Sequence, residues 1–284
     1  MKKLAIINTS TGCTDYLDHG YDIKTARLRV IMGEDSYLDF AELTAEEFFS
    51  KIAANPDILP SSSTPNYVDY EDLLKECEKE GYEEALIITI SSKLSASYAV
   101  AVNVADEYEG NLKVSVYDSL SAGLGEGYLS VEAAKMAKEG KSVAEIVKHL
   151  DELHDNYGMY LVVDSLRLLI KNGRLSGASG FIGSALKIKP ILEVVKEGTI
   201  ETLVKIRSSK KALRGLVDHF VTQVQNVEDF VAFIHTSDNP EAEQFLRDEL
   251  AEKFPGKTVL ETPVTPVLGC HTDCGVVALG YFKK

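Results

Sequence analysis

The sequence predicts an α/β fold: an N-terminal, doubly wound domain with a mainly parallel sheet, followed by a C-terminal α+β domain. In the first half of the chain, short apolar runs alternate with segments of helical periodicity, which is typical of a parallel sheet covered by helices. In the second half, strands and helices follow one another in mixed order. The 284 residues suffice for two such domains. We expect residues 1–158 to form the first domain and residues 159–284 the second.

The elements of the first domain follow from apolar runs and from helix-capping signals. Residues 44–47 and 142–145 are typical of capping boxes, since Thr or Ser is followed by Glu three positions later. We interpret residues 56–65 and 118–127 as loops, because they are rich in turn-forming residues. We expect strands over residues 4–7, 27–32, 86–90 and 114–117, and helices over residues 44–55, 68–80, 95–106, 128–138 and 142–156.

The second domain is predicted to contain a hairpin, further strands and three helices. The hairpin comprises residues 188–195 and 199–206 and turns at Glu197 and Gly198. We expect strands over residues 160–163, 230–235, 259–264 and 276–282, and helices over residues 165–171, 208–224 and 239–254.

The overall composition argues against several classes of function. A formal net charge of −14 disfavours nucleic-acid binding and electrostatic docking to an anionic membrane surface. Four cysteines are too few for a disulfide framework in a chain of this length, so we expect reduced thiols. The first apolar run is too short for a signal-peptide core, and no apolar stretch reaches the length of a membrane span. We therefore expect a cytoplasmic protein.

Hydroxyl side chains cluster where the strongly apolar strand 86–90 is expected to end. Ser91, Ser92, Ser95 and Ser97 lie just before or at the start of the next helix. Folds of this kind bind ligands at the carboxyl ends of parallel strands, and a helix N-terminus offers free N–H groups to an anion. Residues 61–64, also hydroxyls, would complement this set. Two alternatives stay open: Ser91 or Ser92 merely caps the helix, and residues 61–64 form an ordinary loop.

The segment 266–275 contains Cys270, His271 and Cys274. Their spacing does not match the common zinc patterns, and no second ligand pair occurs elsewhere in the sequence, so we expect no metal site. We expect instead a glycine-flanked loop that brings His271 and Thr272 to a polar group of a ligand.

A strong catalytic signature is not found in the sequence. Residues 184–187, 237–239 and 257–258 match parts of the three motifs of penicillin-binding enzymes. We interpret these matches as chance, because Val259 replaces the glycine of the third motif and Asn239-Pro240 is explained as a helix start. Many hydroxyls and few general bases are more typical of binding than of catalysis.

The segment 177–192 is strongly apolar between its glycines. Core packing explains such a composition. The alternative is a hydrophobic tunnel lined by Phe181, Ile182 and Leu186, which beside a hydroxyl cluster would suit an amphiphile with an acidic head and an alkyl tail.

Four segments together resemble the bacterial DegV family, the fatty-acid-binding group that includes the acyl-carrying subunit of fatty acid kinase. They are residues 90–98, 118–127 and 166–192, and the pair His271-Thr272. The resemblance spans nearly the whole chain. It implies one DegV-type unit of two domains with a long-chain fatty acid, palmitate-like, held between them, and no cofactor.

The resemblance also implies which residues hold the ligand. Ser62 and Ser95 match the positions that bind the fatty-acid carboxylate, and His271 and Arg207 match supporting head-group positions. Hydroxyl donors with a histidine and an arginine can hold a carboxylate or an acyl phosphate, because charge-assisted hydrogen bonds are strong.

The sequence departs from the family pattern at three places. Thr9 replaces the acid of a T-D-S motif, Thr64 replaces a glutamine, and Asp273 replaces the glycine of H-T-G. Asp273 would repel an anionic head group unless its carboxylate points away.

We therefore expect a non-catalytic fatty-acid-binding protein, used for lipid transport or for presentation to a fatty acid kinase catalytic subunit. One alternative is an enzyme that acts on an acylated or phosphorylated small molecule with His271 as acid/base. Another is a regulatory protein that senses the lipid and binds a partner.

Overall fold

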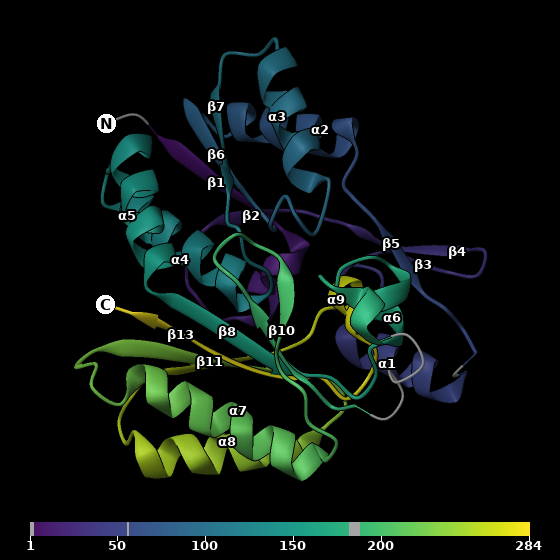
Figure 1. Ribbon diagram of the computed structural model, residues 1–284. Coiled ribbons are helices and arrows are strands. Elements are labelled where there is room, and N and C mark those ends of the chain that lie inside the picture. Colours follow the sequence, from purple (N-terminus) through teal and green to yellow (C-terminus); the bar gives the residue numbers. More distant parts are fainter. Residues whose placement is uncertain (1–2, 56, 182–187) are drawn as a thin grey trace.

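The computed structural model describes residues 3–55, 57–181 and 188–284, which form three sheets with helices around them (Figure 1). The first sheet is parallel throughout, which confirms the predicted N-terminal α/β part. Residues of its central strands are buried on both faces, as in sheets covered by helices on both sides. In spatial order, the strands are β2 (Ile23–Ala26), β1 (Leu4–Thr9), β6 (Glu84–Thr89) and β7 (Lys113–Asp118).

Helices cover both faces of this sheet, so the arrangement is doubly wound. The helices of this part are α1 (Ala45–Ala54), α2 (Tyr67–Lys79), α3 (Ser97–Glu107), α4 (Leu124–Lys138) and α5 (Val143–Asp155). Ile87 packs with Leu74 of α2 and Val104 of α3 on one face. On the other face, Leu86 shares a cluster with Leu129 of α4. Both predicted capping boxes, at Thr44 and Ser142, are present.

The second sheet has six strands in mixed orientation, which confirms the predicted α+β character of the C-terminal part. Its strands, in spatial order, are β10 (Ile200–Val204), β9 (Ile191–Val194), β8 (Tyr157–Val162), β13 (Val277–Lys283), β11 (Phe230–Thr236) and β12 (Val259–Pro263). β11 and β12 are parallel, whereas β13 is antiparallel to both of its neighbours. The sheet begins at Tyr157, beside the domain boundary at residue 158, which stays a prediction.

Alternation along these strands gives the second sheet two apolar faces. Tyr160 and Ala232 belong to a cluster between the sheet and two helices, α7 (Ser209–Val224) and α8 (Pro240–Lys253), which lie at the bottom of Figure 1. The intervening residues, such as Leu161 and Phe233, belong to the cluster shared with the first sheet. The inner face of the six-stranded sheet is therefore directed at the N-terminal part.

A small antiparallel sheet corrects one sequence prediction. It contains β4 (Asp35–Leu38), β3 (Arg29–Met32) and β5 (Ser61–Ser63). Residues 56–65 were expected to be a loop, but three of them pair with β3, and Ser62 lies opposite Val30. The unpaired edge of β3 provides backbone partners that turn-forming composition does not reveal.

Two other predicted loops contain helical turns. α4 begins at Leu124, inside the predicted loop 118–127, because Gly127 lets its first turn approach the backbone of Gly12. Residues 266–272 form α9 (Pro266–Thr272), which Thr265 caps by accepting a hydrogen bond from the backbone N–H of Leu268. His271 is therefore presented by a helix and not by a loop.

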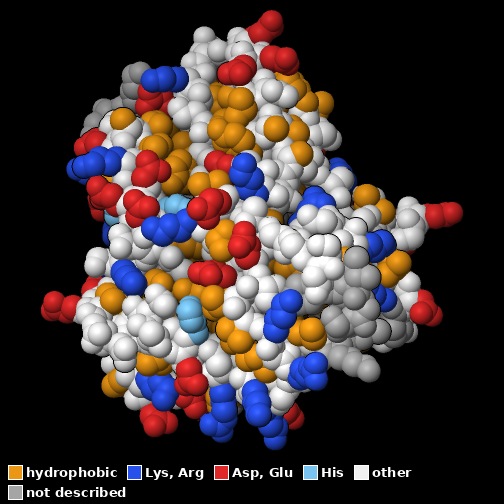
Figure 2. Space-filling view, in the orientation of Figure 1, with side chains coloured by type: hydrophobic (Ala, Val, Ile, Leu, Met, Phe, Trp, Pro, Cys, Tyr) orange, Lys and Arg blue, Asp and Glu red, His pale blue; other side chains and the backbone are white. Residues whose placement is uncertain are grey.

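The remaining short helices are α6 (Arg167–Lys171) and the 3-10 helices η1 (Ser10–Gly12), η2 (Thr14–Tyr16) and η3 (Ala178–Phe181). Within the described ranges, no helix has both the length and the apolar composition needed to cross a membrane. Figure 2 shows acidic and basic side chains interspersed on the face in view, so the negative net charge is not gathered into a single patch there.

Candidate functional site

A cavity lies between the carboxyl end of the parallel sheet and the inner face of the six-stranded sheet. Its volume is about 100 Å³, several times the roughly 10–15 Å³ that a single water molecule requires. Residues that follow strands of the parallel sheet, such as Thr11, Leu28 and Ile90, line it together with residues of the six-stranded sheet, of β5 and of α9. The cavity thus sits where both predicted parts of the chain contribute, which is where a ligand was expected.

One end of the cavity is polar. The side chains that line it there are Ser62, Thr64, Ser95, Arg174, His271 and Thr272. Ser62 and Ser95 are only partly buried, so this end lies near the surface. The structure therefore brings three of the four predicted head-group residues, Ser62, Ser95 and His271, to one place.

His271 and Ser62 are in direct contact although 209 residues separate them. The Nε2 atom of His271 lies 2.9 Å from the Ser62 hydroxyl. α9 packs against β5, and the Cys270 thiol donates to the Ser61 carbonyl oxygen at 3.4 Å, which fixes this approach. Burial, aided by the nearby charge of Arg174, lowers the pKa of His271 to about 4, so its ring is neutral at pH 7.

The other ring nitrogen of His271 is buried without a hydrogen-bond partner among the described residues. A buried polar atom of this kind costs free energy unless a ligand or water satisfies it. Since His271 lines the cavity, a ligand oxygen at the polar end would supply the missing partner.

Ser95 is held by the turn that precedes α3. Its hydroxyl oxygen accepts from the backbone N–H of Ser97 at 3.2 Å and lies 2.9 Å from the Ser97 hydroxyl. Neither Ser91 nor Ser92 caps α3, whose N-cap is Ala96 without a side-chain hydrogen bond. The Ser91 hydroxyl donates instead to the Gly198 carbonyl oxygen at 2.8 Å, so it links the two parts of the chain.

Arg174, and not the predicted Arg207, is the arginine that lines the cavity. Its Nε donates to the Leu94 carbonyl oxygen at 2.9 Å, which holds the guanidinium beside Ser95. Arg207 is exposed, between β10 and α7, and is not among the lining residues. A head-group role for Arg207 stays a prediction. The sequence reasoning missed Arg174 although it lies within the segment 166–192.

Asp273 does not line the cavity. It terminates α9, and its carboxylate lies 3.5 Å from Arg167 Nη2 and accepts from the backbone N–H of Cys274 at 3.0 Å. This carboxylate is therefore paired outside the cavity.

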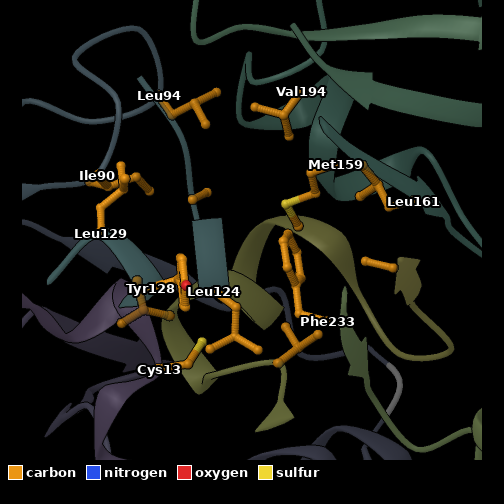
Figure 3. Packing of buried hydrophobic residues seen from close by; sticks show 14 of the residues in the cluster. Cys13, Ile90, Leu94, Leu124, Tyr128, Leu129, Met159, Leu161, Val194 and Phe233 are labelled. Carbon is orange, nitrogen blue, oxygen red and sulfur yellow. The ribbon is translucent and has the colours of Figure 1, made fainter. Parts of the chain in front are cut away.

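The rest of the cavity wall is mostly apolar. Figure 3 shows Ile90 and Leu94 of the parallel-sheet side opposite Met159, Leu161 and Val194 of the six-stranded sheet. The other apolar residues of this wall are Leu28, Ala122, Leu169, Ile200, Val264, Val267, Leu268, Val276 and Ala278. Of the tail contacts predicted from sequence, Ile182 and Leu186 lie outside the described residues, and Phe181 ends η3; their role stays a prediction.

Two further polar residues, Thr11 and His235, line the cavity. Both ring nitrogens of His235 are engaged, one by the backbone N–H of Leu124 and one by the Thr262 hydroxyl at 2.8 Å. Burial lowers the pKa of His235 to about 4, so this ring is neutral. Thr11 is bonded to the buried carboxyl of Glu126, which the sequence reasoning also missed.

Metal ligation finds no support at this site. In the chain as far as it is described, His, Cys, Asp and Glu side chains do not gather in groups of three or more that could hold an ion. Cys270 is buried, which raises the pKa of its thiol and keeps it protonated.

A family model described as an uncharacterised protein of the DegV family matches residues 3–284. The chain belongs to the DegV family. A DegV domain-containing protein of Clostridium acetobutylicum is 31% identical over 285 residues, covering 100% of each sequence. The resemblance drawn from the sequence is thus confirmed.

Solved structures of the DegV family share this fold. The crystal structure of DegV, a fatty acid binding protein from Bacillus subtilis, has a TM-score of 0.90 with 27% identity and covers 100% of both chains. A fatty acid binding DegV family protein from Streptococcus agalactiae has a TM-score of 0.89 with 27% identity and the same coverage. The Fatty Acid Kinase B3 protein of Streptococcus pneumoniae, loaded with linoleic acid, has the same fold, with a TM-score of 0.85, 23% identity, and coverage of 99% and 100%.

Proposed function

We propose that this chain binds one long-chain fatty acid in the cavity between its two large sheets. The observation that carries this proposal is the amphiphilic lining, with hydroxyls, a histidine and an arginine at one end and aliphatic side chains along the wall. A ligand with a carboxylate and an alkyl chain matches both regions. The proteins of Bacillus subtilis and Streptococcus agalactiae, described as fatty acid binding, support the same ligand class.

The carboxylate would lie at the polar end. Ser62 and Ser95 provide hydroxyl donors, and Arg174 provides a charge-assisted donor. The Ser62 hydroxyl has a single proton, so it donates to the carboxylate when Nε2 of the neutral His271 ring carries the ring proton and donates to the Ser62 oxygen. Nδ1, the atom that lacks a partner, is then an acceptor, for water or for the O–H of a protonated head group. The acyl chain would pack along Met159, Leu161 and the other aliphatic residues.

The protein acts in this proposal as a non-catalytic carrier. The polar end is partly exposed, which leaves the ligand carboxylate accessible to a kinase catalytic subunit that would transfer a phosphoryl group to it. An enzyme using His271 as acid/base is less well supported, because a ring with a pKa of about 4 is a poor proton donor at pH 7. None of the hydrogen bonds of His271 in the described structure joins it to a carboxylate.

The site is tested by removing both hydroxyl donors. Each hydrogen bond to a charged group contributes about 1.5–3 kcal/mol, so Ser62→Ala with Ser95→Ala should weaken binding of palmitate at least ~100-fold in a calorimetric titration. Ser92→Ala is the matched control, since Ser92 is exposed, neighbours the site in sequence and does not line the cavity. Equal affinities of the double variant and the control would contradict the assignment.

A further inference from the structure

Glu126 is a fully buried carboxyl that the binding site proposed above does not use. It lies in the first turn of α4, and its oxygens face the end of β1 and the 3-10 helix η1. The backbone N–H of Thr9 donates to Oε1 at 3.2 Å. The Thr9 hydroxyl is bonded to the same oxygen, and the Thr11 hydroxyl lies 2.6 Å from Oε2.

The two threonine hydroxyls are also bonded to each other, at 2.8 Å. The carboxyl and the hydroxyls therefore form a closed ring with three oxygen–oxygen contacts, which we call the Glu126 ring: Oε1 to Thr9, Thr9 to Thr11, and Thr11 to Oε2. The backbone N–H of Ile90 donates separately to the Thr9 hydroxyl oxygen at 3.1 Å. The ring thus joins β1, α4 and the carboxyl end of β6.

Counting protons determines the ionisation state that this ring needs. Three O–H···O hydrogen bonds require three protons, and each hydroxyl supplies one. The third proton must reside on the carboxyl of Glu126. With it, one oxygen of the carboxyl donates, the two hydroxyls each donate and accept, and the other carboxyl oxygen accepts. In the ionised form, only two protons remain, and one of the three contacts loses its hydrogen bond.

The surroundings favour this protonated form. Burial raises the pKa of Glu126 to about 8 against the opposing hydrogen bonds from Thr11 and Thr9, and the charge of Asp118 at the end of β7 adds to the rise. Two further titratable groups interact with Glu126, the Cys13 thiol beside η1 and the Tyr70 phenol of α2. Burial raises the pKa of both, so both are uncharged at neutral pH.

The Glu126 ring reaches the cavity through Thr11, which lines the cavity and is itself fully buried. A ligand carboxylate in the cavity adds a negative charge, which in these buried surroundings disfavours ionisation of Glu126. Binding of an anionic amphiphile and protonation of Glu126 should therefore favour each other, as linkage requires.

We propose that Glu126 is a proton-linked positioning residue of the cavity: its proton closes the ring that holds Thr11, and a bound fatty acid makes Glu126 keep this proton at pH values at which the ligand-free protein releases it. The inference rests on the proposed function and deepens it. It predicts that fatty-acid affinity falls as the pH rises above the range in which the ligand-free protein keeps this proton.

The experiment measures the dissociation constant of palmitate from about pH 6.5 to about pH 9.5 for the protein and for Glu126→Gln. The glutamine amide donates through its NH₂ and accepts through its oxygen, so it closes the same ring without a titrating proton. The ratio of the wild-type to the variant dissociation constant should rise with pH, by at most about tenfold per unit. Because both proteins are measured with the same ligand, the ionisation of the fatty acid affects both dissociation constants equally and does not change their ratio.

Thr11 provides a second pair of variants, which carries the test if Glu126→Gln does not fold. Thr11→Ser keeps the hydroxyl and should keep the pH profile of the wild type. Thr11→Val removes the hydroxyl that joins the ring to the cavity and should flatten the profile. A side chain with a merely structural role would change the affinity by the same factor at every pH.

Three results would overturn the inference or its basis. Identical pH profiles of the wild type and Glu126→Gln, with palmitate bound by both, would overturn the proton linkage alone. A carboxyl NMR signal that Glu126→Gln lacks, and that titrates near the ordinary glutamate range in ligand-free protein, would overturn the ring. No binding of palmitate by the wild type at any pH would overturn the proposed function itself.

Discussion

At the scale of single residues, Arg174 provides a positive charge at the polar end of the cavity. Its guanidinium is held at the polar end by the Leu94 carbonyl oxygen. Arg174→Gln should weaken palmitate binding by about 10- to 100-fold, since a charged hydrogen bond is removed. The effect on the fatty alcohol of the same length should be smaller, because that ligand has no charge.

Arg207→Gln separates the two candidate arginines. The sequence predicts a head-group role for Arg207, whereas its exposed position between β10 and α7 predicts an unchanged affinity for palmitate. A loss of affinity for Arg207→Gln, together with none for Arg174→Gln, would contradict the geometry and support the sequence prediction.

Glu126 also makes a prediction about stability. Its ordinary pKa is near 4.5 and its pKa in the folded protein is about 8. Between these values the unfolded chain has lost the proton that the folded protein keeps, so stability decreases as the pH rises through this window. The Glu126→Gln variant has no titrating carboxyl at this position, so its stability does not decrease in this way. Its stability relative to the wild type should increase by up to about 1.4 kcal/mol per pH unit.

Urea unfolding at several pH values measures this difference. The relative stability of Glu126→Gln should level off above about pH 8, where both states of the wild type are ionised. A difference that stays constant from pH 5 to pH 8 would show that Glu126 is ionised in the folded protein.

At the scale of elements, the close packing of α9 is what positions His271. A side chain at Gly269 would bring its Cβ to 2.5 Å from the buried ring of Phe48 and 3.0 Å from that of Phe49, on α1. Gly269→Ala should therefore destabilise the protein by about 1–3 kcal/mol and weaken palmitate binding through displacement of α9.

Gly215→Ala is the matched control for this substitution. Gly215 lies in α7, where a Cβ would meet only the ends of the Ile191 and Ile206 side chains, at 3.1 and 3.5 Å. Helix propensity favours alanine there by up to about 1 kcal/mol. Thermal unfolding of both variants distinguishes a local clash at Gly269 from a general effect of replacing glycine.

Elements with clear periodicity were predictable, and those defined by distant contacts were not. Apolar runs located the strands of the six-stranded sheet and β1, β6 and β7 of the parallel sheet, whereas the edge strand β2 was not predicted. Capping boxes located the starts of α1 and α5. β5 was missed because its pairing with β3 is non-local. α9 and the start of α4 were missed because their glycines serve close packing against Phe48 and Gly12, whereas composition indicates loops.

The candidate site, too, was predictable from the sequence only in part. Hydroxyl clusters and the segment 266–275 pointed to the regions of Ser62, Ser95 and His271, and the family resemblance gave these residues head-group roles, which stay predictions. No spacing rule joins Ser62 to His271, 209 positions away, so their contact was not predictable from the residues alone. Sequence reasoning did not identify Arg174 or Glu126, because what distinguishes them is contact with residues far away in the sequence, Leu94 for Arg174 and Thr11 for Glu126. Physical signals of this kind exist only after folding.

At the scale of the whole molecule, two sheets of different topology enclose one amphiphilic space. The parallel sheet contributes its carboxyl end, and the six-stranded sheet contributes its inner face. A ligand in this space bridges both parts of the chain and should stabilise the folded protein as a unit. At a concentration one hundred times its dissociation constant, palmitate should add about 2.7 kcal/mol to the free energy of unfolding.

Native mass spectrometry tests the central claim most directly. Delipidated protein incubated with palmitate should gain the mass of one fatty acid per chain, and the double variant Ser62→Ala, Ser95→Ala should not do so at the same ligand concentration. Protein that stays lipid-free after incubation with palmitate and with linoleate, while remaining folded, would contradict the account.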